Sequence, residues 1–365
     1  MTTIRFVDLR KQYESIRADI DAAIATTLES CQFVGGPALT RFEEEFAAYQ
    51  GARHCIGVAN GTDAIEIVFE ALDLPQGSEV IVPANSFIAS SESVSRVGLK
   101  PVFCAADPAT HLIDLADART RITPRTRAIL PVHLYGQPCN MDAMMAFARE
   151  FNLTVVEDSA QAHGAEWKGR RVGTFGAAGT FSFYPGKNLG AYGDGGAIVC
   201  NDDALHRRMR MIANHGRIEK YNHEFEGRNS RLDALQAAIL SAKLKHLEKW
   251  IVARQAMARA YLDGLGGVAG LDLPVWQSQA RHVFHLFVVR TSRRDNLQRY
   301  LKERDIETGI HYPIGLPRLG AYRNTNQSTA SDDMGGEILS LPIGEHLSTE
   351  EVQRVVREVR GFFQE

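Results

Sequence analysis

The sequence predicts an α/β protein, in which a mainly parallel sheet flanked by helices is followed by a smaller C-terminal α+β domain. Apolar runs typical of buried strands alternate with helical segments through the first half of the chain. Such alternation requires crossover connections, which are characteristic of parallel strands covered on both faces. Ligands bind such sheets at the carboxyl ends of the strands, so the residues after each run are candidates for a functional site. The predicted strands end at Val58, Val82, Phe103, Val132 and Val156.

The first fifty residues predict helices. Apolar residues at helical spacing predict one amphipathic helix over residues 11–30. The segment Phe33–Pro37, which contains two glycines, ends it, and a second, short helix is expected over residues 39–49. The residues that define the first helix are Tyr13, Ile16, Ile20, Ile24 and Leu28.

A long helical region over residues 231–262 is interpreted as the link between two domains. The expected division is a large domain of residues 1–245 and a small C-terminal domain of residues 246–365. The small domain is expected to contain a strand at residues 282–289, helices at residues 295–304 and 349–363, and a polar surface loop at residues 327–333.

The composition is typical of a globular protein. The 365 residues are 44% hydrophobic and 23% charged, with a formal net charge of −3. The absence of a dominant basic tract argues against nucleic acid as a partner. Five dispersed cysteines favour reduced thiols in the cytoplasm, and neither a signal peptide nor a membrane span is expected. His282 and His285 fall in a predicted strand on opposite faces, so no metal site is expected.

One lysine lies in a setting that indicates a chemical role. Lys187 follows an aromatic run that contains Phe181, Phe183 and Tyr184, and it lies among glycines. The aromatic residues indicate a buried approach, and a desolvated lysine near other positive groups has a lowered pKa and serves as a nucleophile and base. An ordinary surface position is the alternative. Pyridoxal phosphate (PLP) chemistry requires such an amine to form a Schiff base with the cofactor aldehyde.

PLP chemistry also requires an acidic group that keeps the pyridine nitrogen of the cofactor protonated. Asp158 directly follows the apolar run Leu153–Val156. This position favours a functional site over the alternatives, which are a helix cap and a carboxylate at the edge of the core. Gln161 lies three residues further on and is a candidate donor to the phenolic oxygen of the cofactor.

A strand-to-helix turn at Asn60–Ile65 supplies candidates for holding the cofactor phosphate. Gly61 and Thr62 lie where backbone N–H groups and the helix dipole attract an anion, although Thr62 has the alternative role of a helix cap. Ser182 is a second candidate phosphate ligand. Phe87 is a candidate to stack on the pyridine ring, with core packing as the alternative.

With these residues in place, the chain resembles the nucleotide-sugar aminotransferases, the DegT-type branch of the fold-type I PLP enzymes. The resemblance extends from Phe6 to the last predicted helix. It implies a seven-stranded, mainly parallel sheet. The matching motifs are Asn60–Ala64, His133–Gln137, Glu157–Gln161, Ser182–Asn188, Gly193–Gly196, Asn229–Asp233 and His311–Pro313.

The resemblance also implies roles for individual residues. Lys187 would carry the Schiff base and shuttle the proton, and Asp158 would pair with the pyridine nitrogen. Asn229 matches a residue that reaches the phosphate of the neighbouring subunit's cofactor, which implies a homodimer with shared active sites. The other implied cofactor contacts are Gly61, Thr62 and Ser182 for the phosphate, Phe87 for stacking and Gln161 for the phenolic oxygen.

The implied reaction is ping-pong transamination between L-glutamate and a nucleotide-linked keto-sugar, with pyridoxamine phosphate as the half-reaction form. The resemblance is closest to enzymes that aminate C-3 of dTDP-3-keto-6-deoxyhexoses. By that resemblance the substrate side contains Tyr184 and His311, and His215 and Tyr221 also match. The alternatives are a UDP-3-keto-uronate or a 4-keto-6-deoxy sugar as substrate, and a catalytically silent PLP-binding regulator. One departure is Gly186, where many family members have threonine, serine or alanine.

Overall fold

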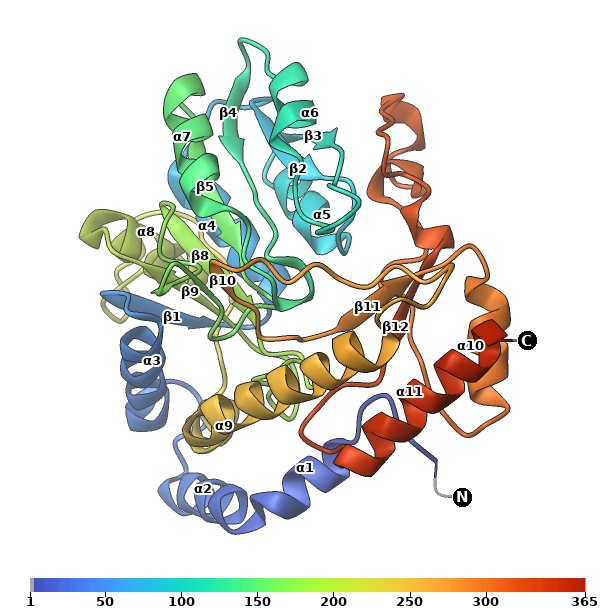
Figure 1. The fold of residues 1–365 in the computed structure, drawn as a ribbon. Helices are drawn as coiled ribbons and strands as arrows, with labels where there is room; N and C mark the ends of the chain where they lie inside the picture. Colours follow the sequence, from blue (N-terminus) through green and yellow to red (C-terminus); the bar gives the residue numbers. More distant parts are fainter. Residues whose placement is uncertain (1–2, 365) are drawn as a thin grey trace.

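A seven-stranded sheet forms the centre of the protein, in a computed structural model that describes residues 3–364 (Figure 1). Strand β9 runs antiparallel to both of its neighbours, and the other neighbouring pairs are parallel. The predicted mainly parallel sheet is therefore confirmed. In sheet order the strands are β1 (His54–Val58), β9 (Gly196–Cys200), β8 (Ala178–Ser182), β5 (Thr154–Asp158), β4 (Thr126–Ile129), β2 (Glu79–Pro83) and β3 (Lys100–Cys104).

Helices cover both faces of this sheet because side chains alternate along each strand. On β2, Val80 and Val82 pack into one core cluster, whereas Ile81 between them packs into another. The first face is covered by α4 (Gly61–Leu72), α5 (Ala89–Arg96) and α8 (Asp203–Ala213). The second face is covered by α3 (Gly36–Gln50) and α9 (Ala234–Leu265) near β1, and by α6 (Leu115–Thr120) and α7 (Met141–Phe151) near β3.

The N-terminal helical region differs from the prediction. Residues 11–30 do not form one helix, because the chain divides into α1 (Leu9–Ser15) and α2 (Arg17–Ser30). Ile16 leaves helical geometry, with φ −132° and ψ 21°, and its side chain is buried in the core with Ile20. Helix α3 also begins earlier than expected, because Pro37 is accommodated in its first turn.

Helix α9 is continuous for 32 residues and contributes to two cores. Its first half packs with α3 and the sheet through Leu240 and Leu247, and its second half packs through Ala258 and Tyr261 into a separate cluster. The division into residues 1–245 and 246–365 stays a prediction. The second cluster is built from β11 (Phe287–Arg290), β12 (Ile338–Leu341), α10 (Arg294–Lys302) and α11 (Thr349–Gln364).

The strand predicted at residues 282–289 is wrong in its first half. The chain forms a short strand β10 (Ala280–Arg281) and then β11, and His282–Leu286 lies outside both. The reason is local, because Phe284 has a positive φ of 43° and its N–H donates to His282 Nδ1 at 2.9 Å. His282 and His285 therefore do not lie on a strand, and the prediction that their rings point to opposite faces of one does not apply. Strand β10 joins β6 (Glu166–Trp167) and β7 (Arg170–Arg171) in a small antiparallel sheet.

The polar segment at residues 327–333 is more than the predicted surface loop. Ser331 and Asp332 are each only 3% exposed. The Gln327 amide accepts from the Phe103 N–H at 2.8 Å and donates to the Pro101 carbonyl at 3.1 Å, so it covers the free edge of β3.

The short 3₁₀ helices of the structure are η1 (Leu134–Gly136), η2 (Leu316–Arg318), η3 (Arg323–Thr325) and η4 (Met334–Gly336).

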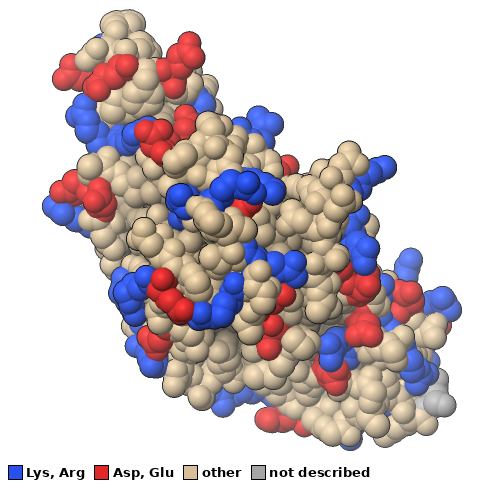
Figure 2. All heavy atoms as spheres, turned by 90° about the horizontal axis from the view of Figure 1, so that it is seen from above, with Lys and Arg blue, Asp and Glu red and all other residues tan. Residues whose placement is uncertain are grey.

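Figure 2 shows basic and acidic side chains interspersed on the face seen from above. Within residues 3–364, none of the helices combines the length and the apolar character needed to cross a membrane. The same residues contain no group of three His, Cys, Asp or Glu side chains arranged to hold a metal ion.

Candidate active site

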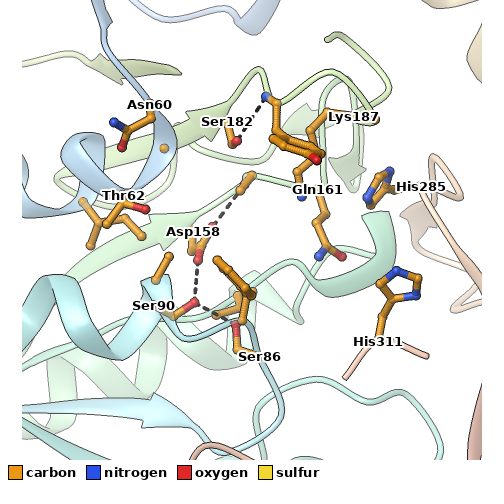
Figure 3. A pocket seen from close by; sticks show the side chains of 18 of the residues that line it. Asn60, Thr62, Ser86, Ser90, Asp158, Gln161, Ser182, Lys187, His285 and His311 are labelled. Carbon is orange, nitrogen blue, oxygen red and sulfur yellow. Dashed lines mark hydrogen bonds between the residues drawn. The ribbon is translucent and has the colours of Figure 1, made fainter. Parts of the chain in front are cut away.

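A cavity of about 960 Å³ lies at the carboxyl ends of the strands. Figure 3 shows side chains from several strand ends converging there, with Asn60 and Thr62 at one end and His285 and His311 at the other. The location agrees with the general rule for parallel α/β sheets. Nine of the predicted site residues line this cavity: Gly61, Thr62, Phe87, Asp158, Gln161, Ser182, Tyr184, Lys187 and His311.

Lys187 reaches the cavity from the loop after β8. Phe181 and Phe183 are fully buried and anchor this loop, whereas Tyr184 is 60% exposed. On the far side of the loop, Lys243 Nζ donates to the Gly190 carbonyl at 2.7 Å. Burial lowers the pKa of Lys187 to about 8, against the opposing effect of the Asp158 charge. A lysine with this pKa is partly neutral near pH 7 to 8 and can act as a nucleophile.

The other cations at the cavity are already paired. Arg96 Nε lies 2.9 Å from a Glu66 carboxylate oxygen, and Arg254 Nη2 lies 3.0 Å from a Glu345 carboxylate oxygen. Arg228 also donates to Glu66. Lys187 differs, because no ion pair within residues 3–364 includes it. Its amine is therefore available to react with a ligand in the cavity.

Asp158 ends β5 and is only 5% exposed. The Ala160 N–H donates to its Oδ1 at 3.1 Å, and the Ser90 hydroxyl donates to its Oδ2 at 2.7 Å. A carboxylate held in this way is fixed in orientation and keeps further acceptor capacity for a donor in the cavity.

Gln161 is oriented by the backbone. Its Oε1 accepts from the Tyr135 N–H at 2.7 Å, which leaves Nε2 as the donating end, and Nε2 donates to the Tyr312 hydroxyl at 3.1 Å. Burial and the Asp158 charge raise the pKa of Tyr312, so its hydroxyl stays protonated at neutral pH. Gln161 therefore presents a donor on the cavity side, as its predicted role requires.

The turn from β1 into α4 is built for close approach. The Asn60 side chain caps α4 by accepting from the Asp63 N–H at 2.8 Å, so Thr62 is not the cap. A Cβ on Gly61 would lie 2.7 Å from Ser182 Cβ, which only glycine avoids. The turn therefore brings the first N–H groups of α4 and the hydroxyls of Thr62 and Ser182 to one end of the cavity, an arrangement that suits a phosphate.

These residues fit PLP. The cavity combines a phosphate-binding turn, a carboxylate, an oriented amide and a lysine with a lowered pKa. Phe87 is 52% exposed and lies 5.5 Å from the Tyr312 ring, between centroids, so it is not the core residue of the alternative interpretation. An exposed ring at the cavity is available to stack on a planar ligand.

Three predicted residues lie outside this cavity. Asn229 lines a second cavity of about 360 Å³, which shares Asp194 with the first. His215 is exposed, and Tyr221 is 80% exposed. The structure therefore does not bring Asn229, His215 and Tyr221 together with Lys187 within one chain.

The sequence interpretation missed several residues that the fold brings to the cavity. His285, whose pKa is lowered by burial and by Lys187, comes from the segment predicted as a strand. Phe6 comes from the N-terminus and stacks on His311, 5.5 Å between ring centroids. Ser86 and Ser90 follow β2 on either side of Phe87, and their place after a predicted strand was a usable signal.

A lysine with a lowered pKa and an oriented carboxylate, at the carboxyl edge of a parallel sheet, define an enzyme that acts on carbonyl and amine groups through its lysine. The chain belongs to the DegT/DnrJ/EryC1/StrS aminotransferase family, whose model matches residues 14–360. The prediction from the resemblance is thereby confirmed, and the protein is an aminotransferase of fold-type I.

Individual relatives cover nearly the whole chain. The dTDP-3-amino-3,4,6-trideoxy-alpha-D-glucose transaminase of Streptomyces venezuelae is 46% identical over 361 residues, which are 98% of this chain and 95% of the relative. The dTDP-3-amino-3,6-dideoxy-alpha-D-galactopyranose transaminase of Aneurinibacillus thermoaerophilus is 45% identical over 98% of this chain and 99% of the relative. The crystal structure of S. venezuelae DesV in complex with a ketimine intermediate is similar with a TM-score of 0.97, at 45% identity over 100% of both chains.

Proposed function

We propose that this aminotransferase moves an amino group from L-glutamate to C-3 of a dTDP-3-keto-6-deoxyhexose, making a dTDP-3-amino-3,6-dideoxyhexose. The observation that carries the proposal is the lowered pKa of Lys187 in a cavity that also contains Asp158. The two transaminase relatives support the substrate, because the names of both describe a dTDP sugar with an amino group at C-3.

The proposed cofactor is PLP, with pyridoxamine phosphate as the form between the half-reactions. Bound PLP supplies an electron-accepting ring that stabilises negative charge at the reacting carbon. Asp158 would accept a hydrogen bond from the protonated ring nitrogen and so keep it protonated, Gln161 Nε2 would donate to the phenolic oxygen, and Phe87 would cover one face of the ring. The phosphate is held by Gly61, Thr62 and Ser182.

Lys187 both binds the cofactor and moves the proton. Its Nζ takes the proton from the α-carbon of the donor amino acid and, in the second half-reaction, returns one to the sugar carbon. Tyr184 and His311 are proposed to face the sugar. Burial and Lys187 lower the pKa of His311 to about 4, so this imidazole is neutral at pH 7 and acts as a hydrogen-bonding group rather than a cation.

We further propose a cytoplasmic homodimer. Asn229, His215 and Tyr221 lie outside the chain's own main cavity, which supports a role for them at the site of a second copy. The division into domains at residues 245 and 246 is retained as part of the proposal. The cysteines described are all free thiols, as a reducing compartment allows.

The test is a substrate panel with purified protein, PLP and L-glutamate. Keto-sugars carried on dTDP and UDP, with the ketone at C-3 or C-4, are offered in parallel, and the aminated product is identified by mass spectrometry and NMR. Amine formed at C-3 of the dTDP-6-deoxy sugar supports the proposal. Amine formed only on the UDP-linked uronate or only at C-4 contradicts it. The absorption spectrum before and after L-glutamate reports the cofactor half-reaction separately.

A further inference from the structure

Two buried serines lie behind the Asp158 carboxylate. Ser90 Oγ lies 2.7 Å from Asp158 Oδ2, and Ser86 Oγ lies 2.7 Å from Ser90 Oγ (Figure 3). Ser86 is 3% exposed and Ser90 is 1% exposed, so both hydroxyls are largely shielded from solvent. The three side chains form a continuous hydrogen-bonded chain from the connection after β2 to the end of β5.

The direction of this chain follows from counting protons. An ionised carboxylate only accepts hydrogen bonds, and a serine hydroxyl has one proton to donate. Ser90 therefore uses its proton on Asp158, and Ser86 must be the donor in the contact between the two hydroxyls. The donation runs from Ser86 to Ser90 to Asp158, and a hydroxyl that accepts a hydrogen bond is a better donor itself.

The carboxylate is thus held at both oxygens by groups of this chain. Ala160 N–H donates to Oδ1 and Ser90 donates to Oδ2. The titratable side chains whose pKa values respond to the Asp158 charge are Lys187 and Tyr312, both at the cavity. Neither contacts the serine side of the carboxylate through a hydrogen bond within residues 3–364.

We propose that Ser86 and Ser90 are positioning residues, whose directional hydroxyl chain holds the Asp158 carboxylate aimed at the ring nitrogen of the cofactor. This inference rests on the proposed PLP-dependent function. The five residues from Ser86 to Ser90 also include Phe87, so one short segment contacts the carboxylate and supplies the ring proposed to cover the cofactor.

The experiment compares Ser90→Ala and Ser86→Ala with the matched control Ser91→Ala. Ser91 lies on α5, is fully buried, and donates to the backbone carbonyl of Ile88 rather than to Asp158. The first readout is the dissociation constant of PLP from each protein, measured by titrating PLP into the PLP-free apo form. The second readout is the pH midpoint of the visible absorption change of the PLP-loaded protein, without any amino donor.

Ser90→Ala is expected to weaken PLP binding by about tenfold, the effect of one hydrogen bond to a charged group. It is also expected to shift the pH midpoint by roughly 0.5–1 unit. The carboxylate then accepts one hydrogen bond fewer, which changes its interaction with the protonated ring nitrogen. Ser86→Ala should change both quantities in the same direction by a smaller amount, and Ser90→Thr, which keeps the hydroxyl, should restore them. Ser91→Ala should match the parent.

Serine variants that behave like Ser91→Ala in both readouts would overturn the inference. If Ser90→Ala does not fold, as judged by thermal unfolding, Ser86→Ala decides alone, because it leaves the contact between Ser90 and Asp158 in place. Failure of the proposed function looks different, since the parent itself would then show no PLP absorption that depends on Lys187.

Discussion

Lys187 is a charged group that the folded chain holds at a cost. Its pKa falls from 10.5 to about 8 because burial disfavours the ammonium form. A lysine whose folded-state pKa is lowered opposes folding fully below pH 8, and this effect disappears as the pH rises above the unfolded value. A residue that opposes folding is expected to have a chemical role. Replacing it should therefore have two separate effects, one on turnover and one on stability.

Lys187→Met should lower the turnover rate by at least roughly 1,000-fold, because the nucleophile and proton carrier is lost. The apo variant should be as stable as the parent or more stable near pH 7, by up to about 3 kcal/mol, since the buried charge is removed. Steady-state kinetics and denaturant unfolding at pH 7 test both. Retained turnover would contradict the assignment of the nucleophile.

The same pKa predicts how fast the apo protein takes up its cofactor. Only the neutral amine reacts, so the rate of PLP recombination should rise about tenfold per pH unit below pH 8 and level off above it. The pKa values of the neighbouring His163 and His311, about 3 and about 4, place their titrations below this range. Stopped-flow absorbance between pH 6 and 9 measures the profile, and a flat profile would show that another group limits the reaction.

Adjacent carboxylates on β5 should respond differently to neutralisation. Asp158→Asn should lower the rate by roughly 100-fold or more with little loss of stability. Glu157 faces the other side of the sheet, where its oxygens accept from the N–H groups of Gly173, Phe175 and Gly176. Glu157→Gln should therefore destabilise the fold by about 3 kcal/mol. Unfolding curves and kcat for both variants provide the comparison, and equal behaviour would contradict these assignments.

At the scale of elements, four of the five predicted strand ends were correct to within two residues, whereas Val132 lies three residues beyond the end of β4 and loop geometry was not predictable. The apolar runs located β1, β2, β3 and β5 to within two residues, because buried parallel strands are nearly continuous apolar segments. The break at Ile16 was not predictable from periodicity, since the buried residue keeps the helical spacing while its backbone leaves the helix. Phe284 likewise takes a positive φ that its residue type does not suggest.

The turn between β1 and α4 gives the test at this scale. Gly61→Ala would place a Cβ 2.7 Å from Ser182 Cβ, so the turn must open and the phosphate-binding groups separate. The affinity for PLP should fall by about tenfold or more, measured by equilibrium titration. Gly336→Ala is the matched control, because a Cβ there meets open space. An unchanged affinity in Gly61→Ala would contradict a phosphate site at this turn.

At the scale of the whole molecule, the site residues divide into two groups. Those at or just after the carboxyl ends of β1, β2, β5 and β8 line one cavity, and these are the residues whose roles depend on strand ends. Asn229 lies at a second cavity, and nothing in the order of residues distinguishes a group that serves its own chain from one that serves another. The proposal that Asn229 serves a second subunit comes from the resemblance to the family. Physical reasoning from one sequence could not have led to it.

Subunit complementation tests the proposed sharing of sites. A Lys187→Ala chain and an Asn229→Ala chain are co-expressed with different tags, and the mixed dimer is purified. If Asn229 serves the other subunit, each mixed dimer contains one site with both defects and one intact site. The purified mixed dimer should then have about half of the parental activity, from its one intact site. If Asn229 acts within its own chain, both sites stay defective and no activity returns.

The Gln327 side chain has a consequence for how this protein behaves in a crowded solution. By pairing with Phe103 and Pro101, its amide occupies a donor and an acceptor on the open edge of the central sheet. Exposed edges of this kind recruit strands from other molecules. Gln327, which is not among the residues that line the Lys187 cavity, thus occupies part of the edge where an eighth strand could add, so its replacement should favour aggregation without changing catalysis.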